Sequence, residues 1–205
     1  MKKCDGIKNI IFDVGNVLVD FRYRDYMKEL GFSDSLCKEI EDNIVTNELW
    51  NEFDKGVMSD EEFFGLIRQQ LPERKDEVQL FFDKIEGICA PFDYVEDWLS
   101  SIKAAGYKIY ILSNYPVSVW EKHEKTIFKF MPYIDGKIVS GYEKLIKPDP
   151  AIYKLLFERY NLDPKECIFF DDRIKNVMAA RELGVRAIEF TDYETHRRML
   201  DNGLY

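Results

Sequence analysis

The sequence predicts an α/β fold, in which a parallel β-sheet is covered by helices on both faces and interrupted after its first strand by a helical insertion. Three observations lead to this prediction. Short apolar runs recur along the chain, helical segments separate the later runs, and one long segment after the first run has helical spacing throughout. Strands that alternate with helices form parallel sheets, so the predicted core is Rossmann-like.

Five short runs rich in β-forming residues are the predicted strands. Several of them are apolar at consecutive positions, which is typical of strands buried on both faces of a sheet. The runs span residues 9–12, 108–112, 137–139, 167–170 and 186–190.

Start and stop signals delimit the helices between the later strands. Asp149 is a predicted N-cap and Pro150 occupies the first helical position after it. Gly106 and Gly184 follow two of the helical segments, where glycine commonly ends a helix. The predicted helices span residues 93–105, 151–160 and 175–183.

Residues 21–90 differ from the rest, because their apolar positions recur at helical spacing and no convincing strand is found among them. Ser59 and Glu62 form a predicted capping box for one of these helices. We therefore expect an α/β core made of residues 1–20 and 91–205, with residues 21–90 as a helical insertion.

Composition excludes several classes of protein. The chain has 205 residues, of which 46% are hydrophobic, so it can bury a substantial core and is not a disordered chain. Its 29 basic and 38 acidic residues give a net charge of −9, which makes nucleic acid and anionic membranes poor partners. No apolar stretch is long enough for a signal peptide or a membrane span, so a cytoplasmic location is expected. The oligomeric state cannot be read from the sequence.

Cysteine spacing gives no sign of a zinc or redox site. The four cysteines form no Cys-x-x-Cys pair and have no histidine nearby, so we expect reduced and mostly buried thiols. They are Cys4, Cys37, Cys89 and Cys167.

Polar residues follow the predicted strands, where open parallel sheets bind their ligands. A carboxylate follows the first strand, a hydroxyl and an amide follow the second, and an acidic pair follows the fourth. A lysine precedes the helix that begins at Pro150. In chain order the candidates are Asp13, Ser113, Asn114, Lys147, Asp171 and Asp172.

Taken singly, most of these residues have an ordinary structural explanation. Asp13 could be a turn or cap residue, Ser113 could begin a loop, and Lys147 could be a solvated surface lysine. The adjacent Asp171 and Asp172 would repel each other unless a cation lies there. It is their order along one predicted sheet edge that favours a catalytic site.

Here the sequence resembles the haloacid dehalogenase superfamily. The resemblance lies in Ile-Phe-Asp-Val-Gly-Asn-Val at 11–17, Leu-Ser-Asn at 112–114, Ile-Lys-Pro at 146–148 and Phe-Asp-Asp at 170–172. The insertion is similar to the helical cap of small-molecule phosphatases in this family. The Asp-x-Gly-Asn-Val opening is similar to that of a bacterial α-D-glucose-1-phosphate phosphatase group.

The resemblance implies a phosphatase. Asp13 would attack phosphorus and form an aspartyl-phosphate. Mg²⁺ would be held by Asp13, the carbonyl of Gly15 and Asp172, with Asp171 in or near the shell through water. The phosphoryl oxygens would be held by Ser113, by backbone N–H groups near Asn114 and by Lys147.

One residue departs from the family pattern, in which a second aspartate two positions after the nucleophile protonates the leaving group. That position is Gly15 here, so a positioned acid worth about 10²–10⁴-fold is missing. A steep dependence of rate on leaving-group acidity is therefore expected. A shallow dependence would mean that water or another residue, such as one from the cap, supplies the proton.

Two alternatives remain open at this point. A metal-independent 2-haloacid dehalogenase would use the same aspartate, although Asp171 and Asp172 argue against it. A catalytically idle phosphometabolite-binding protein is indicated only by Gly15. The expected substrate is a small phosphorylated metabolite, such as a sugar phosphate, and four cap aromatics could stack on it or belong to the core. They are Tyr23, Tyr26, Trp50 and Phe53.

Overall fold

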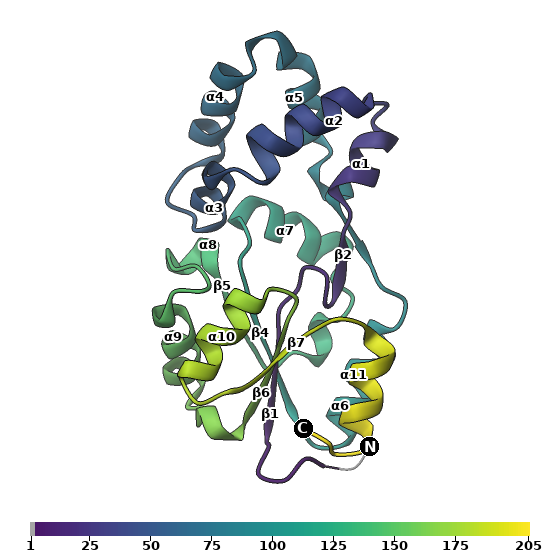
Figure 1. Cartoon of the computed structure of the whole chain (residues 1–205), viewed down its shortest axis with the longest axis vertical. Coiled ribbons are helices and arrows are strands. Elements are labelled where there is room, and N and C mark those ends of the chain that lie inside the picture. The colour runs from purple at the N-terminus through teal and green to yellow at the C-terminus, as the bar shows by residue number, and fades with distance from the viewer. Residues whose placement is uncertain (1–2) are drawn as a thin grey trace.

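We describe residues 3–205 in a computed structural model of the chain. The core is a five-stranded sheet in the order β5-β4-β1-β6-β7, and every neighbouring pair is parallel (Figure 1). This confirms the predicted α/β class, and each predicted strand agrees with its observed counterpart to within one residue at either end. The strands are β1 (Asn9–Phe12), β4 (Lys108–Ser113), β5 (Gly136–Val139), β6 (Cys167–Asp171) and β7 (Arg186–Glu189).

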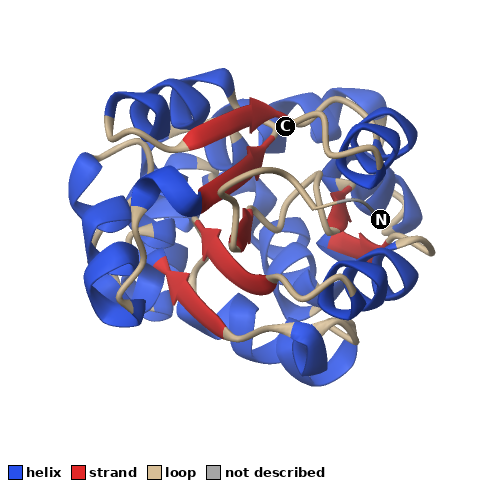
Figure 2. Ribbon diagram, turned by 90° about the horizontal axis from the view of Figure 1, so that it is seen from below, coloured by secondary structure: helices blue, strands red, loops and turns tan. Residues whose placement is uncertain are grey.

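Helices cover both faces of this sheet, as Figure 2 shows from below. Side chains alternate along β1, so Ile10 and Phe12 pack with one group of helices while Ile11 packs with the other. The first group includes α6 (Val95–Ala104) and α11 (Tyr193–Asp201). The second includes α9 (Pro150–Tyr160) and α10 (Ile174–Glu182), while α7 (Val117–Thr126) follows β4 at the end nearer the insertion.

The predicted helix signals take the expected form. The Asp149 side chain accepts a hydrogen bond from the N–H of Ala151 at the start of α9. Gly106 and Gly184 both have positive φ, a conformation that glycine adopts without the strain other residues meet. Ser59 and Glu62 form the capping box. All four cysteines are free and buried, as expected.

The insertion is a layer of helices above the sheet (Figure 1). Buried aromatic rings fill its interior, where Phe53 and Phe63 stack with ring centroids 4.2 Å apart. Its helices are α1 (Tyr23–Glu29), α2 (Asp34–Ile40), α3 (Glu48–Asp54), α4 (Asp60–Gln70) and α5 (Lys75–Asp83). A π-helical turn (Glu41–Val45) and a 3-10 turn (Pro72–Arg74) connect some of them, and a second 3-10 turn (Ile85–Ile88) leads from α5 back towards the core.

A short antiparallel ribbon joins the insertion to the core, and the sequence analysis missed it. The strands β2 (Val19–Phe21) and β3 (Cys89–Pro91) pair with Phe21 opposite Cys89. Segments of three residues are too short to show an alternating pattern, which is why no strand was expected here. Both chain connections therefore leave the core side by side.

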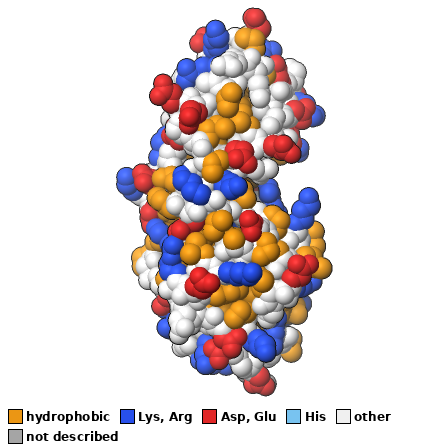
Figure 3. All heavy atoms as spheres, turned by 90° about the vertical axis from the view of Figure 1, so that its left-hand side faces the viewer, with side chains coloured by type: hydrophobic (Ala, Val, Ile, Leu, Met, Phe, Trp, Pro, Cys, Tyr) orange, Lys and Arg blue, Asp and Glu red, His pale blue; other side chains and the backbone are white. Residues whose placement is uncertain are grey.

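The insertion also contacts the core away from this ribbon. Lys144 donates a hydrogen bond to the carbonyl of Gly56, and Ser118 donates one of 2.9 Å to Asp60. A Cβ added at Gly56 would clash with the backbone of Gly141, so glycine permits this close approach. Figure 3 shows an indentation between the two parts on one side.

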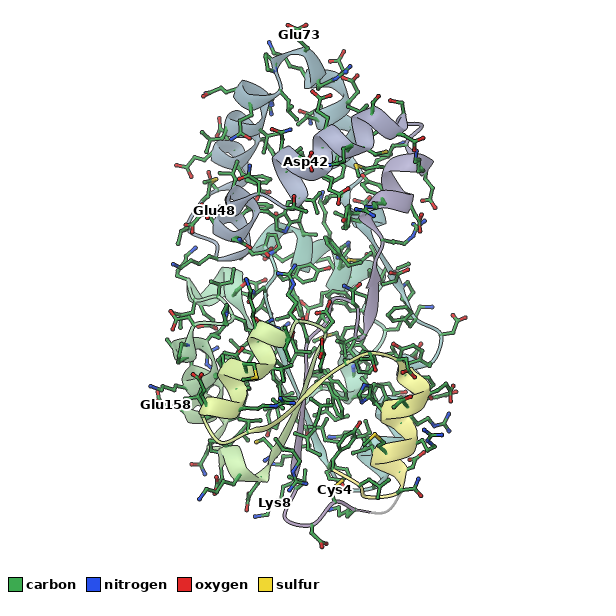
Figure 4. All side chains as sticks on the ribbon, viewed as in Figure 1. Cys4, Lys8, Asp42, Glu48, Glu73 and Glu158 are labelled. Carbon is green, nitrogen blue, oxygen red and sulfur yellow. The ribbon has the colours of Figure 1, made fainter. Side chains whose placement is uncertain are left out.

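Charged side chains cover the outside of both parts. In Figure 4, Glu73 lies at the far end of the insertion and Lys8 at the opposite end of the core, while Glu158 points away from α9. No helix within residues 3–205 has both the length and the apolar character needed to cross a membrane.

Candidate active site

The candidate residues lie together at one edge of the sheet. Since β1 pairs with β4 on one side and β6 on the other, the carboxyl ends of these three strands are adjacent. Counting Gly15 there are seven candidate residues, and five of them line a single cavity between the core and the insertion. They are Asp13, Gly15, Asn114, Lys147 and Asp172. Ser113 and Asp171 complete the group, and both are almost completely buried beside them.

Asp13 is held in a fixed orientation immediately after β1. Its Oδ1 atom accepts hydrogen bonds from the N–H of Val14 at 2.7 Å and from the hydroxyl of Ser113 at 2.8 Å. The Lys147 Nζ atom lies 3.0 Å from the same oxygen. No donor described in residues 3–205 contacts Oδ2. One oxygen therefore orients the side chain, and the other is available to a ligand.

Burial raises the pKa of Asp13 to about 6, and the nearby Asp171 and Asp172 add to this shift while Lys147 opposes it. The ionised form of Asp13 therefore predominates at neutral pH. A cation bound at this corner would lower its pKa again and favour the carboxylate further.

Lys147 is a buried charge between two carboxylates. It is 3% exposed, and its Nζ atom lies 2.6 Å from Asp171 as well as 3.0 Å from Asp13. Burial alone would lower the pKa of Lys147, but the two carboxylates raise it above its usual value, so the side chain stays charged. This excludes the alternative of a solvated surface lysine.

The Asn114 side chain holds the backbone of Lys147 in place. The Asn114 side chain accepts a hydrogen bond of 2.8 Å from the N–H of Lys147 and donates one of 3.0 Å to its carbonyl. These bonds join the end of β4 to the loop before α9. Both ends of the Asn114 amide are thus engaged in holding the loop that carries the lysine.

The two acidic residues after β6 have different surroundings. Asp171 is fully buried and accepts hydrogen bonds from Lys147, from the Asn176 side chain and from the N–H of Arg173. Asp172 faces the cavity and accepts one bond of 2.8 Å from Asn16. Burial raises the pKa of Asp172, and the bond from Asn16 opposes that shift. Hydrogen-bond donors of the protein therefore surround the Asp171 carboxylate, while the Asp172 carboxylate is more accessible to a bound ligand.

Three carboxylates meet closely enough to hold one metal ion. One oxygen each from Asp13, Asp171 and Asp172 lies within 4.8 Å of the others. Hard oxygen ligands of this kind suit Mg²⁺, and the raised pKa of Asp13 reflects in part the repulsion that a cation would relieve. The residues present therefore fit the metal that the motifs imply.

Asn16 was missed as a positioning residue. It adopts a left-handed backbone conformation with φ of 56°, which asparagine tolerates better than most residues. Besides contacting Asp172, its side chain accepts a hydrogen bond of 3.2 Å from the N–H of Phe21 in β2. It thus links the acidic pair to the ribbon below the insertion, a role visible only once the ribbon is known.

The insertion supplies the opposite wall of the cavity. Of the four aromatic residues considered from sequence, only Trp50 lines it. Phe53 is in the aromatic interior, Tyr26 donates a hydrogen bond to the carbonyl of Phe81, and Tyr23 contacts Glu41. Other residues of this wall are Phe21, Val45, Asn51, Asp54 and Ile88.

Asp54 is an acidic residue of this wall that sequence reasoning missed. It is the last residue of α3, where a carboxylate is unfavourable because the C-terminal end of a helix carries partial negative charge. This unfavourable helix position was the feature of the sequence that could have pointed to Asp54. The insertion contains many other acidic residues, so the feature did not stand out.

Replacing Lys147 with Met should lower the free energy of unfolding by about 3–5 kcal/mol, because two buried carboxylates would lose their shared cation. Urea denaturation in the presence of EDTA measures this effect without help from a metal. The matched control is Lys137→Met, which removes a partly exposed pair with Glu124 and should cost less than about 1 kcal/mol. Equal losses in the two variants would contradict the prediction.

Comparison with known proteins identifies the family. The model of the haloacid dehalogenase-like hydrolases matches residues 7–184. The chain belongs to this family. It is therefore a hydrolase, as the motifs predicted.

Two curated relatives of this haloacid dehalogenase-like hydrolase align over most of both chains. A sesquiterpene phosphatase of Aspergillus oryzae is 25% identical over 195 residues, covering 92% of each protein. A D-ribitol-5-phosphate phosphatase of Bacteroides thetaiotaomicron is 26% identical over 197 residues, covering 89% of this chain and 91% of the relative. Both names describe phosphatases, and their substrates differ.

A solved structure of the same family shares the fold. It is a haloacid dehalogenase family enzyme of Bacteroides thetaiotaomicron in complex with magnesium and inorganic phosphate. The identity is 26%, the TM-score is 0.73, and the alignment covers 93% of this chain and 98% of that one. That relative therefore binds magnesium and phosphate in a similar fold. The groups gathered in the candidate site here suit the same two ligands.

Proposed function

We propose that this hydrolase is a Mg²⁺-dependent phosphatase that cleaves small phosphomonoesters through an aspartyl-phosphate on Asp13. The observation that carries the proposal is the Asp13 side chain itself. One of its oxygens is held by Val14, Ser113 and Lys147, while the other is available to a ligand in a cavity that also contains Asp172.

The residues divide the chemistry between them. Asp13 would attack phosphorus, so that a bond from its oxygen to phosphorus forms while the bond to the leaving oxygen breaks. Ser113, backbone N–H groups near Asn114, and Lys147 would hold the phosphoryl oxygens. Water would then cleave the aspartyl-phosphate and restore the carboxylate.

Mg²⁺ would be held by Asp13, Asp172 and the carbonyl of Gly15. When bound, it would offset the repulsion between the carboxylate and the phosphate ester. Asp171 would act indirectly, because its oxygens already accept hydrogen bonds from Lys147, Asn176 and Arg173. The magnesium and phosphate in the related crystal structure support this assignment.

The substrate would be a small phosphorylated metabolite, with a sugar phosphate as the first candidate. The phosphate would lie at the strand ends of the core, residues 1–20 and 91–205. The organic group would face residues 21–90, acting as a cap. Trp50 offers an aromatic surface in that wall, and the apolar face of a sugar ring packs on such surfaces. A cavity enclosed in this way would exclude nucleic acid and other large substrates.

Phosphate release from a panel of monoesters with Mg²⁺ tests the proposal. The panel contains p-nitrophenyl phosphate, sugar 1-phosphates, sugar 6-phosphates and pentitol phosphates. We expect turnover of several esters and a clear preference among the sugar and pentitol phosphates. If no ester is hydrolysed faster by the wild type than by Asp13→Asn, the protein is not a phosphatase.

A further inference from the structure

We infer that Asp54, from the cap, donates the proton to the leaving group and so performs the task for which Gly15 has no side chain. This inference rests on the proposed phosphatase function. Asp54 lines the same cavity as Asp13, Gly15 and Asp172, but it lies on the opposite wall. An ester bound between these walls would place its phosphorus towards Asp13 and its organic group towards the cap. The oxygen between them is the leaving group.

Contacts with the core fix the backbone around Asp54. The hydroxyl of Ser140, at the start of α8 (Ser140–Glu143), donates a hydrogen bond to the carbonyl of Asp54. Two residues later, Gly56 accepts one from Lys144 and packs against Gly141. The end of α3 is thus attached to the core close to the site, although it belongs to the cap. A proton donor needs such fixed placement.

The side chain has the right protonation state for a donor. Burial raises the pKa of Asp54 to about 8, and Asp13 adds to the shift, while Arg173, Lys147 and Trp50 oppose it. Tyr115 also faces it, but burial raises the pKa of Tyr115 well above its usual value, so it stays neutral. Asp54 is therefore largely protonated at neutral pH, and efficient general acids have a pKa near the working pH.

The other ionisable groups of the cavity are poor candidates. Asp13 and Asp172 are the proposed nucleophile and metal ligand, and Lys147 is held between two carboxylates. Arg173 carries a guanidinium group, which pairs with carboxylate and phosphate oxygens. Burial raises the pKa of Cys89 to about 12, which makes it a weak acid. Asp54 is the remaining group that can give up a proton in this cavity.

The proton balance closes over one cycle. As the bond between phosphorus and the leaving oxygen breaks, that oxygen takes the proton of the Asp54 carboxyl group and departs as an alcohol. The resulting Asp54 carboxylate then accepts a proton from the water that attacks the aspartyl-phosphate. Asp54 is neutral again when phosphate leaves, and no further reactant is needed.

This assignment changes the expected leaving-group dependence. With Asp54 in place, kcat/KM of the wild type should depend only weakly on leaving-group acidity, instead of steeply as Gly15 alone would predict. The test compares Asp54→Asn with the wild type on p-nitrophenyl phosphate and on a primary alkyl phosphate. The asparagine is close in size and cannot donate a carboxyl proton.

We expect Asp54→Asn to lower kcat/KM for the alkyl phosphate by about 10²–10⁴-fold. The loss with p-nitrophenyl phosphate should be less than about threefold, because that leaving group departs as a stable anion and needs little protonation. Glu52→Gln is the matched control, since it removes an exposed acid from the same helix, and it should change neither value. Asp54→Ser provides a second variant without an acid should the first fail to fold.

Two results would overturn the inference. Equal losses with both esters would show that Asp54 only supports binding or structure. An alkyl phosphate rate that remains close to wild type would show that the proton comes from elsewhere. If the wild type hydrolyses neither ester with Mg²⁺ present, the proposed function fails, and this inference fails with it.

Discussion

Asp13→Asn is expected to abolish phosphate release from every ester that the wild type hydrolyses. The amide retains the size of the side chain and an oxygen that can accept hydrogen bonds from Val14 and Ser113, but it loses the attacking anion. Initial rates of phosphate release should fall at least a hundredfold. Activity above a hundredth of the wild-type rate would place the nucleophile elsewhere.

Two measurements separate this chemical effect from misfolding. Circular dichroism and the melting temperature of Asp13→Asn should remain close to those of the wild type. Asp5→Asn makes the same substitution at an exposed position and should retain full activity. Loss of activity in both variants would indicate damage unrelated to the nucleophile.

Removal of divalent metal is expected to have an equally large effect. Treatment with EDTA should eliminate turnover and added Mg²⁺ should restore it, because the carboxylates of Asp13 and Asp172 would otherwise repel the phosphate ester. Asp172→Ala should raise the Mg²⁺ concentration needed for half-maximal rate. Asp5→Ala, far from the cluster, should leave that concentration unchanged.

Full activity in EDTA would contradict the metal assignment. It would favour the alternative in which Asp13 displaces halide without a metal. Halide release from a 2-haloacid would then be the assay to perform. Halide release that is absent in EDTA-treated protein, together with phosphate release restored by Mg²⁺, would support the phosphatase.

The strands were predictable because the sheet is parallel and covered on both faces. Burial on both faces makes β6 apolar along almost its whole length, so residues 167–170 were recognisable without their neighbours. The β2–β3 ribbon was not predictable, since three residues on each side show no period. Its pairing joins Phe21 to Cys89, which are far apart in the chain.

The strand-end residues were predictable for a related reason. Asp13 and Asp171 directly follow or end strands, so sequence position alone places them at the sheet edge. Asp54 depends instead on how the insertion docks. Trp50 and Phe53 lie three positions apart on the same helix and both pack in the aromatic interior, yet only Trp50 also lines the cavity. Helical spacing does not tell which side faces the core.

The β2–β3 ribbon has a consequence for how such enzymes diversify. Because Phe21 pairs with Cys89, the two ends of the insertion are about 5 Å apart, a gap that a short turn can close. One graft at this ribbon can therefore remove or exchange the whole insertion without breaking the five-stranded sheet. Such an exchange would replace the wall that faces the insertion side of the cavity and leave the strand-end residues in place. If Asp54 donates the proton, each exchanged segment must supply an acidic side chain for this step as well as the residues that line the cavity.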